Sequence, residues 1–157
     1  MKNNEIITLA NELPILGNLT GAKFAYAIAK NQDIATREAK HLSEGLKSTP
    51  EYEEYEKKRI ALCEELSKKD ESGKAMMIPI GNGVSRYVFE DEKAFNEELA
   101  KLGKEYKEVL DARKKQEEDY NKLLEEESTV EFFKMDQDII PDNITVQQMN
   151  IIKNLIN

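Results

Sequence analysis

The chain has 157 residues, and 23 Lys and Arg against 31 Asp and Glu give it a formal charge of −8. Charged residues make up 34% of the sequence and hydrophobic residues 39%, which favours elongated, solvated helices in one domain over residues 1–157. There is no run of about 18 apolar residues, so we expect no membrane span. The start, Met1 to Glu5, lacks the apolar stretch of a secretory signal. The negative charge also disfavours direct binding of nucleic acid, which depends on Lys and Arg.

The first half of the chain predicts three helices. A short helix over residues 4–13 is capped by Asn3 or Asn4 and ends at Pro14. A second helix begins after Thr20, and its least polar stretch, residues 24–29, is expected to lie inside. A third runs from a Thr49 cap, with Pro50 at its first position, to about residue 69. The sequence leaves open which way the chain turns at Pro50.

Residues 76–89 form a hairpin pattern, because two short apolar runs flank the turn residues Gly81, Asn82 and Gly83. Pro79 makes its strand an edge or a bulged strand. A two-stranded hairpin is marginal alone, so we expect it to rest on another part of the protein.

Residues 92–126 predict one long helix capped by Asp91, whose apolar residues repeat with the 3–4 spacing of a coiled coil. We interpret this stripe as a packing seam. Arg113 and Gln116 place polar groups in it that need partners. The seam residues are Phe95, Leu99, Leu102, Tyr106, Val109, Tyr120 and Leu123.

The C-terminal part, residues 129–157, predicts a strand and a helix. The strand, over residues 128–135, could add a third strand to the hairpin. Thr145 and Gln148 fit a capping box at the start of the helix. This helix is apolar around much of its circumference, so either its own chain or a neighbour covers it. Its possible partner-facing residues are Met149, Ile152, Leu155 and Ile156.

Together these elements predict a mainly α fold. It contains a long antiparallel helical hairpin or coiled coil over residues 20–126, a small two- to three-stranded sheet, and a short C-terminal helix.

The residues offer little chemistry for a catalytic site. His41 lies among charged residues and is expected to face water, whereas Cys63 lies near an apolar seam and is expected to be a buried thiol. Phosphate-binding glycine loops and metal-ligand spacings are absent. We therefore expect no enzyme activity, no cofactor, no metal and no small-molecule substrate.

Several segments resemble a family of small tailed-phage or prophage proteins of unknown function. Residues 24–31 are similar to that family's SYALAKN-like opening, and the likeness continues at residues 55–65, 69–74, 87–91 and 94–99. The chain departs from the family in its longer third helix and in its break at Ser48-Thr49-Pro50. The resemblance implies a phage origin, a setting in the host cytoplasm or the virion, and no catalytic residues.

The leading hypothesis is a non-enzymatic phage interaction protein that acts through protein–protein contacts as a virion or assembly component, forming a symmetric multimer. One alternative is an inhibitor of a host protein such as a defence enzyme. Another is a prefoldin-like holdase, which the order helix, β-hairpin, helix suggests.

Overall fold

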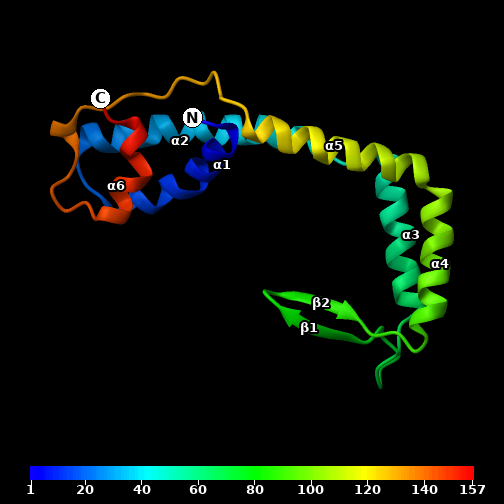
Figure 1. Cartoon of the computed structure of the whole chain (residues 1–157). Coiled ribbons are helices and arrows are strands. Elements are labelled where there is room, and N and C mark those ends of the chain that lie inside the picture. Colours follow the sequence, from blue (N-terminus) through cyan, green and yellow to red (C-terminus); the bar gives the residue numbers. More distant parts are fainter. The chain divides into compact units, whose positions relative to one another are not determined.

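A computed structural model describes all residues, 1–157, and the fold is mainly helical with one small antiparallel sheet (Figure 1). This confirms the predicted fold class. The chain forms two compact units. The first unit joins Met1–Lys47 to Gln116–Asn157, and the second is Ser48–Lys115.

The first unit is built around one long helix, with short helices and an extended segment packed against it. Its elements are α1 (Asn3–Glu12), the 3-10 helix η1 (Leu13–Asn18), α2 (Ala22–Glu44), the end of α5 (Lys107–Glu125), η2 (Gln137–Ile139), α6 (Val146–Ile152) and η3 (Lys153–Leu155). The apolar core gathers side chains from both ends of the chain: Ile6, Leu13, Leu16, Phe24, Met135, Ile152 and Leu155 are at most 1% exposed.

Helix α1 starts one residue earlier than the sequence indicated, and its N-cap is Lys2. The expected caps, Asn3 and Asn4, have other partners. The Asn3 amide donates to the Leu123 carbonyl, and the Asn4 amide donates to Glu125. These side chains therefore attach α1 to the end of α5 instead of capping α1.

The N-cap of helix α2 is Gly21, with φ +129°, rather than the expected Thr20. The expectation that residues 24–29 lie inside is wrong in part. Phe24 and Ala27 are buried, whereas Tyr26 is 61% exposed. Because the core touches one face of α2, Ala25 and Ala29 lie on the outer side.

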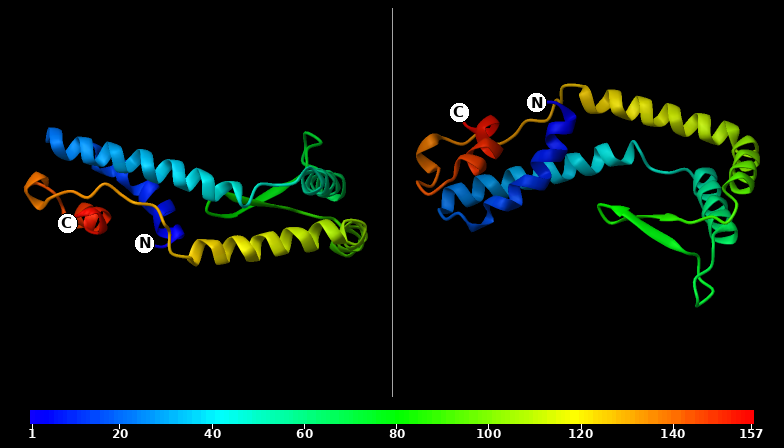
Figure 2. Two further views of the ribbon diagram at one scale, coloured as in Figure 1. Left: turned by 90° about the horizontal axis from the view of Figure 1, so that it is seen from above. Right: turned by 60° about the horizontal axis from the view of Figure 1, so that its bottom comes forward.

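The predicted strand over residues 128–135 is not formed, so the sheet has two strands and not three. This segment runs extended beside α2 (Figure 2). Its backbone partners lie elsewhere: the buried Asn31 side chain holds Phe133, and Met135 bridges to Ile156 near the C-terminus. The backbone of this segment therefore takes its hydrogen bonds from the Asn31 side chain and from the C-terminal residues, and not from a neighbouring strand.

The second unit is a pair of helices joined through the β-hairpin. Its elements are α3 (Pro50–Leu66), β1 (Met77–Gly81), β2 (Val84–Tyr87), α4 (Glu92–Glu105) and the start of α5. Helices α3 and α4 lie side by side as an antiparallel pair (Figures 1 and 2). Both predicted caps are confirmed: Thr49 accepts from the Tyr52 N–H at 3.3 Å, and Asp91 accepts from the Lys93 and Ala94 N–H groups at 2.9 Å.

The helix expected over residues 92–126 is interrupted at Tyr106, where φ is −101° and ψ is 21°, so α4 and α5 are separate helices. Gly103, a weak helix former, lies in the last turn before the break. The Tyr106 side chain is held by α3: its hydroxyl donates to Glu54 at 2.7 Å, and its ring lies 5.6 Å from that of Tyr55. One continuous seam is therefore divided between two helices.

The hairpin matches its prediction closely. Strands β1 and β2 pair antiparallel, with Ile78 opposite Arg86 and Pro79 opposite Ser85. The register shifts between Pro79 and Gly81, so the strand that carries the proline is irregular, as expected. At its base the hairpin meets the end of α3, where the Lys68 N–H donates to the Val88 carbonyl.

Candidate functional site

The first half of the predicted seam packs inside the second unit. Phe95, Leu99 and Leu102 are half-buried on α4, the helix that pairs with α3. The Phe95 ring stacks on Phe89 at 3.9 Å and anchors the base of the hairpin to α4. The hydrogen bond from Tyr106 is the main cause that lowers the pKa of Glu54. These side chains pack α4 against α3 within the same chain.

The polar seam residues expected to need partners both have them. The Arg113 guanidinium lies 4.9 Å from the centre of the Tyr52 ring, within the second unit. In the first unit, the Gln116 amide donates to the carbonyls of Gly45 and Lys47 at 3.1 and 3.0 Å. Gln116 thus satisfies carbonyl groups at the C-terminal end of α2.

The last part of the seam belongs to the first unit. Tyr120 packs so closely on Gly45 that a Cβ there would lie 3.3 Å from its ring. Leu123 is half-buried, and its carbonyl accepts from Asn3. Val109, at the start of α5, is also half-buried. The seven seam residues therefore do not form one surface.

The C-terminal helix was expected to be covered either by its own chain or by a neighbour, and its central residues are covered by its own chain. Ile152 and Leu155 are fully buried in the chain's own core, and Met149 and Ile156 are half-buried against it. The predicted capping box is present, since Thr145 Oγ1 accepts from the Gln148 N–H at 3.2 Å and the Gln148 side chain accepts from the Thr145 N–H at 3.0 Å. Val146 is the exposed large apolar residue of this helix, at 81%.

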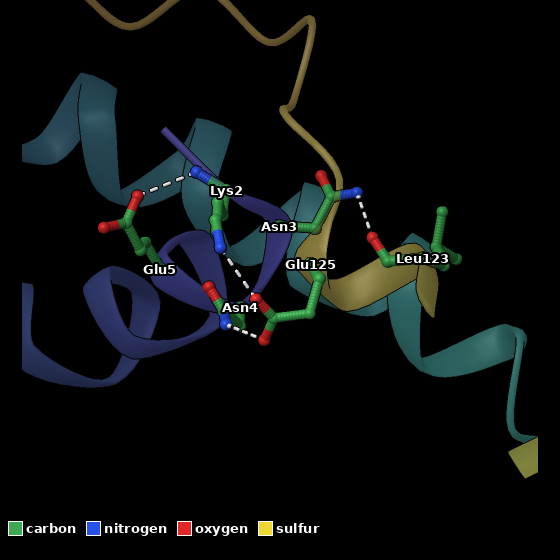
Figure 3. A network of polar contacts seen from close by, with 6 residues as sticks. All are labelled: Lys2, Asn3, Asn4, Glu5, Leu123 and Glu125. Atoms are coloured by element: carbon green, nitrogen blue, oxygen red, sulfur yellow. Dashed lines mark hydrogen bonds and ion pairs between the residues drawn. The ribbon is translucent and has the colours of Figure 1, made fainter. Parts of the chain in front are cut away.

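A polar cluster joins the N-terminal segment to the end of α5 (Figure 3). The Lys2 ammonium lies 2.7 Å from Glu125, and the Asn4 amide donates to the other oxygen of the same carboxylate. The hydrogen bond and charge of Lys2 lower the pKa of Glu125, and Glu125 raises the pKa of Lys2. Because these groups are exposed, the cluster fixes the position of the segment more than it stabilises the fold.

His41 and Cys63, the two side chains that could act as nucleophiles, have the exposure that the sequence predicted. The His41 side chain is 65% exposed, and its Nδ1 lies 3.5 Å from Glu38. Cys63 is a free thiol, 4% exposed, and burial raises its pKa. A buried thiol with a raised pKa holds little thiolate at neutral pH.

An open pocket of about 420 Å³ lies where the start of α2 meets residues 133–139. Its walls include the rings of Tyr26 and Phe133, which meet edge to face at 5.9 Å. Charges of both signs, Lys23 and Asp138 among them, share the lining. This mixture gives the pocket no preference for an anion or a cation.

The largest group of uncovered apolar side chains lies on the β-hairpin. Met76 is 41% exposed, Met77 48%, Val84 54% and Ile80 61%. We call these four residues the hairpin surface; Met76 and Met77 are consecutive in an extended segment, so their side chains lie on opposite sides of the hairpin. The strands project from the base of the α3–α4 pair (Figures 1 and 2). The sequence predicted a hairpin that rests on another part of the protein, and this exposed surface was not predicted. A usable signal was present, since residues 75–85 carry no charge in a chain that is 34% charged.

No group of three or more His, Cys, Asp or Glu side chains is arranged to hold a metal ion, and no helix is both long and apolar enough to cross a membrane. Comparisons with family models, curated proteins and solved structures found no match.

Proposed function

We propose that this chain is a non-enzymatic interaction protein, encoded by a phage or prophage, that serves as an assembly component by associating with further copies of itself. The observation that carries the proposal is the hairpin surface. Large apolar side chains stay 41–61% exposed there, on a sheet of only two strands. Exposed apolar clusters of this kind mark protein–protein contacts.

The hairpin has a physical reason to seek a further contact. An isolated two-stranded sheet is marginal in water and gains stability when another layer or strand covers it. Full burial of a large apolar side chain contributes about 1.5–3 kcal/mol. The members of the hairpin surface are already about half buried, so each has about 1 kcal/mol to gain. A partner that covers the members on one side of the hairpin gains about 2 kcal/mol from apolar contact.

The phage origin is supported by the sequence resemblance. The segments that carry it span both units, from residues 24–31 in the first to residues 94–99 in the second. Its expected setting is the host cytoplasm or the virion. In that setting a small chain without catalytic chemistry acts by occupying a place in an assembly.

The test is the mass of the purified chain by size-exclusion chromatography with light scattering, over a hundredfold range of concentration. We expect a multimer of fixed stoichiometry. The double variant Ile80→Glu, Val84→Glu places charges on the hairpin surface and should return the chain to a monomer. The matched control is Val146→Glu, because Val146 is 81% exposed on α6 and lies in the other unit.

A chain that stays monomeric at every concentration contradicts the assembly role. A monomer that binds one purified host enzyme with a 1:1 stoichiometry and stops its activity replaces that role with inhibition. Mass spectrometry of virions from a lysogen that carries the gene gives an independent measurement. A stoichiometric copy number per particle supports a place in the particle itself.

A further inference from the structure

The two edges of the β-hairpin differ in what they offer to another strand. The Val88 N–H donates to the Met76 carbonyl, so these residues direct backbone groups toward each other, although the Met76 N–H donates to the Lys68 carbonyl instead. In an antiparallel ladder such pairs alternate along the strands. The register, with Ile78 opposite Arg86, therefore makes that pair hydrogen-bonded too. Met77 and Tyr87, which lie between these two pairs, direct their backbone groups away from the partner strand. Pro79 and Ser85, one residue further on, do the same.

On β1 the outward position opposite Ser85 is Pro79, which has no N–H. A proline on an edge strand blocks the addition of a further strand. On β2 the outward positions are Ser85 and Tyr87, and both keep their N–H and C=O groups. The sheet ends at β2, because no third strand pairs with it. One edge of the hairpin is thus blocked and the other is open.

The charge distribution identifies the partner that fits the open edge. The chain carries −8, so two copies repel each other wherever acidic faces meet. Residues 75–89 hold a single charged residue, Arg86, so two copies can approach through this segment with little repulsion. An antiparallel strand pair about a two-fold axis is self-complementary, so a single strand supplies both sides.

We propose that β2 pairs antiparallel with β2 of a second copy of this chain, joining the two hairpins into one four-stranded sheet. The inference rests on the proposed self-association and assigns one contact to it, along the strand edge; the apolar side chains of the hairpin surface stay available to a further layer. The register that sets Ser85 opposite Ser85 of the second copy is favoured, because it places Arg86 opposite Val84. The two guanidinium groups are then not directly opposite each other. Two like charges directly opposite each other would destabilise the strand pair.

The test uses light scattering on the full chain and two variants at one position. Ser85→Pro removes one outward N–H and leaves the ladder with β1 intact, since Ser85 is not a hydrogen-bonded position in that ladder. Ser85→Thr keeps the N–H and is the matched control. We expect a dimeric or higher mass for the wild type and for Ser85→Thr. For Ser85→Pro we expect the dissociation constant of this contact to rise at least tenfold.

Amide hydrogen exchange provides a second measurement that needs no variant. The Ser85 and Tyr87 amides should gain protection as the concentration of the wild type rises. The Arg86 amide, which faces β1, should be protected to the same extent throughout. These exchange rates also report whether the hairpin of Ser85→Pro is still formed.

A multimeric wild type whose mass is unchanged by Ser85→Pro, and whose Ser85 and Tyr87 amides exchange at the same rate at every concentration, overturns the β2 contact and leaves the proposed function standing. A wild type that is monomeric throughout overturns both. Dissociation by Ser85→Pro, with Ser85→Thr unaffected, supports the β2 contact.

Discussion

Asn31 is the side chain whose loss should affect the first unit most specifically. It is fully buried on α2, and its amide pairs with both backbone groups of one residue. Asn31 Nδ2 donates to the Phe133 carbonyl at 2.9 Å, and the Phe133 N–H donates to Asn31 Oδ1 at 2.8 Å. This arrangement takes the place of a neighbouring strand for the extended segment after α5.

Replacing Asn31 with alanine leaves both Phe133 backbone groups without a partner. A buried polar group that loses its hydrogen bond costs about 1–3 kcal/mol. Phe133 is half-buried, so water can partly compensate, and we expect a total loss of about 2–4 kcal/mol. Asn96→Ala is the matched control, because Asn96 is exposed on α4. Its effect should lie within about 0.5 kcal/mol.

The assay is urea unfolding followed by circular dichroism, combined with amide exchange of residues 130–136. For Asn31→Ala we expect a lower midpoint and faster exchange of the Phe133 amide. The reasoning is refuted if Asn31→Ala and Asn96→Ala have equal stability, or if the Phe133 amide exchanges as slowly as in the wild type.

Three further predictions concern single positions. Leu155→Ala should destabilise the chain by about 2–5 kcal/mol in urea unfolding, because Leu155 is fully buried, while Val146→Ala at an 81% exposed site should change little. Cys63 should react with a thiol reagent many times more slowly in the folded chain than in urea, and equal rates would contradict its burial. Lys2→Gln should return the pKa of Glu125 toward its ordinary value in an NMR titration, since Lys2 lowers it. The stabilisation from this lowered pKa is present above the ordinary carboxyl pKa and is lost as the pH falls through the lowered one, so an unchanged titration in Lys2→Gln contradicts the assignment.

Local signals in the sequence were enough to predict the starts of α3, α4 and α6 and the hairpin. Thr49, Asp91 and Thr145 act as caps because a side-chain oxygen meets a free N–H within a few residues of chain. The glycines and asparagine of the turn at residues 81–83 likewise specify a hairpin through their own backbone preferences.

Features that depend on distant residues were not predictable in the same way. The heptad pattern continues through Tyr106, but the helix breaks there, where contacts from α3 hold the tyrosine. Asn3 resembles a cap in sequence, yet its partner is Leu123, 120 residues away. The strand-like residues 128–135 find Asn31 and the C-terminus in place of a sheet.

The candidate site was the least predictable part. The seam and the C-terminal helix were predicted as interaction sites because both are strongly apolar. The same apolar character buries Ile152 and Leu155 in the chain's own core. The hairpin surface is less apolar in pattern but is left uncovered. Exposure depends on what packs against a segment, which its own sequence does not record.

The most direct test of self-association through the hairpin is an isotope-filtered nuclear Overhauser experiment on an equal mixture of labelled and unlabelled chain. In the proposed register, Val84 of one copy and Arg86 of the second copy form a non-hydrogen-bonded pair, the closer of the two kinds of pair in an antiparallel ladder. The account predicts an intermolecular contact between their Hα protons. Its absence from a sample that light scattering shows to be multimeric, or intermolecular contacts confined to other segments, would contradict it.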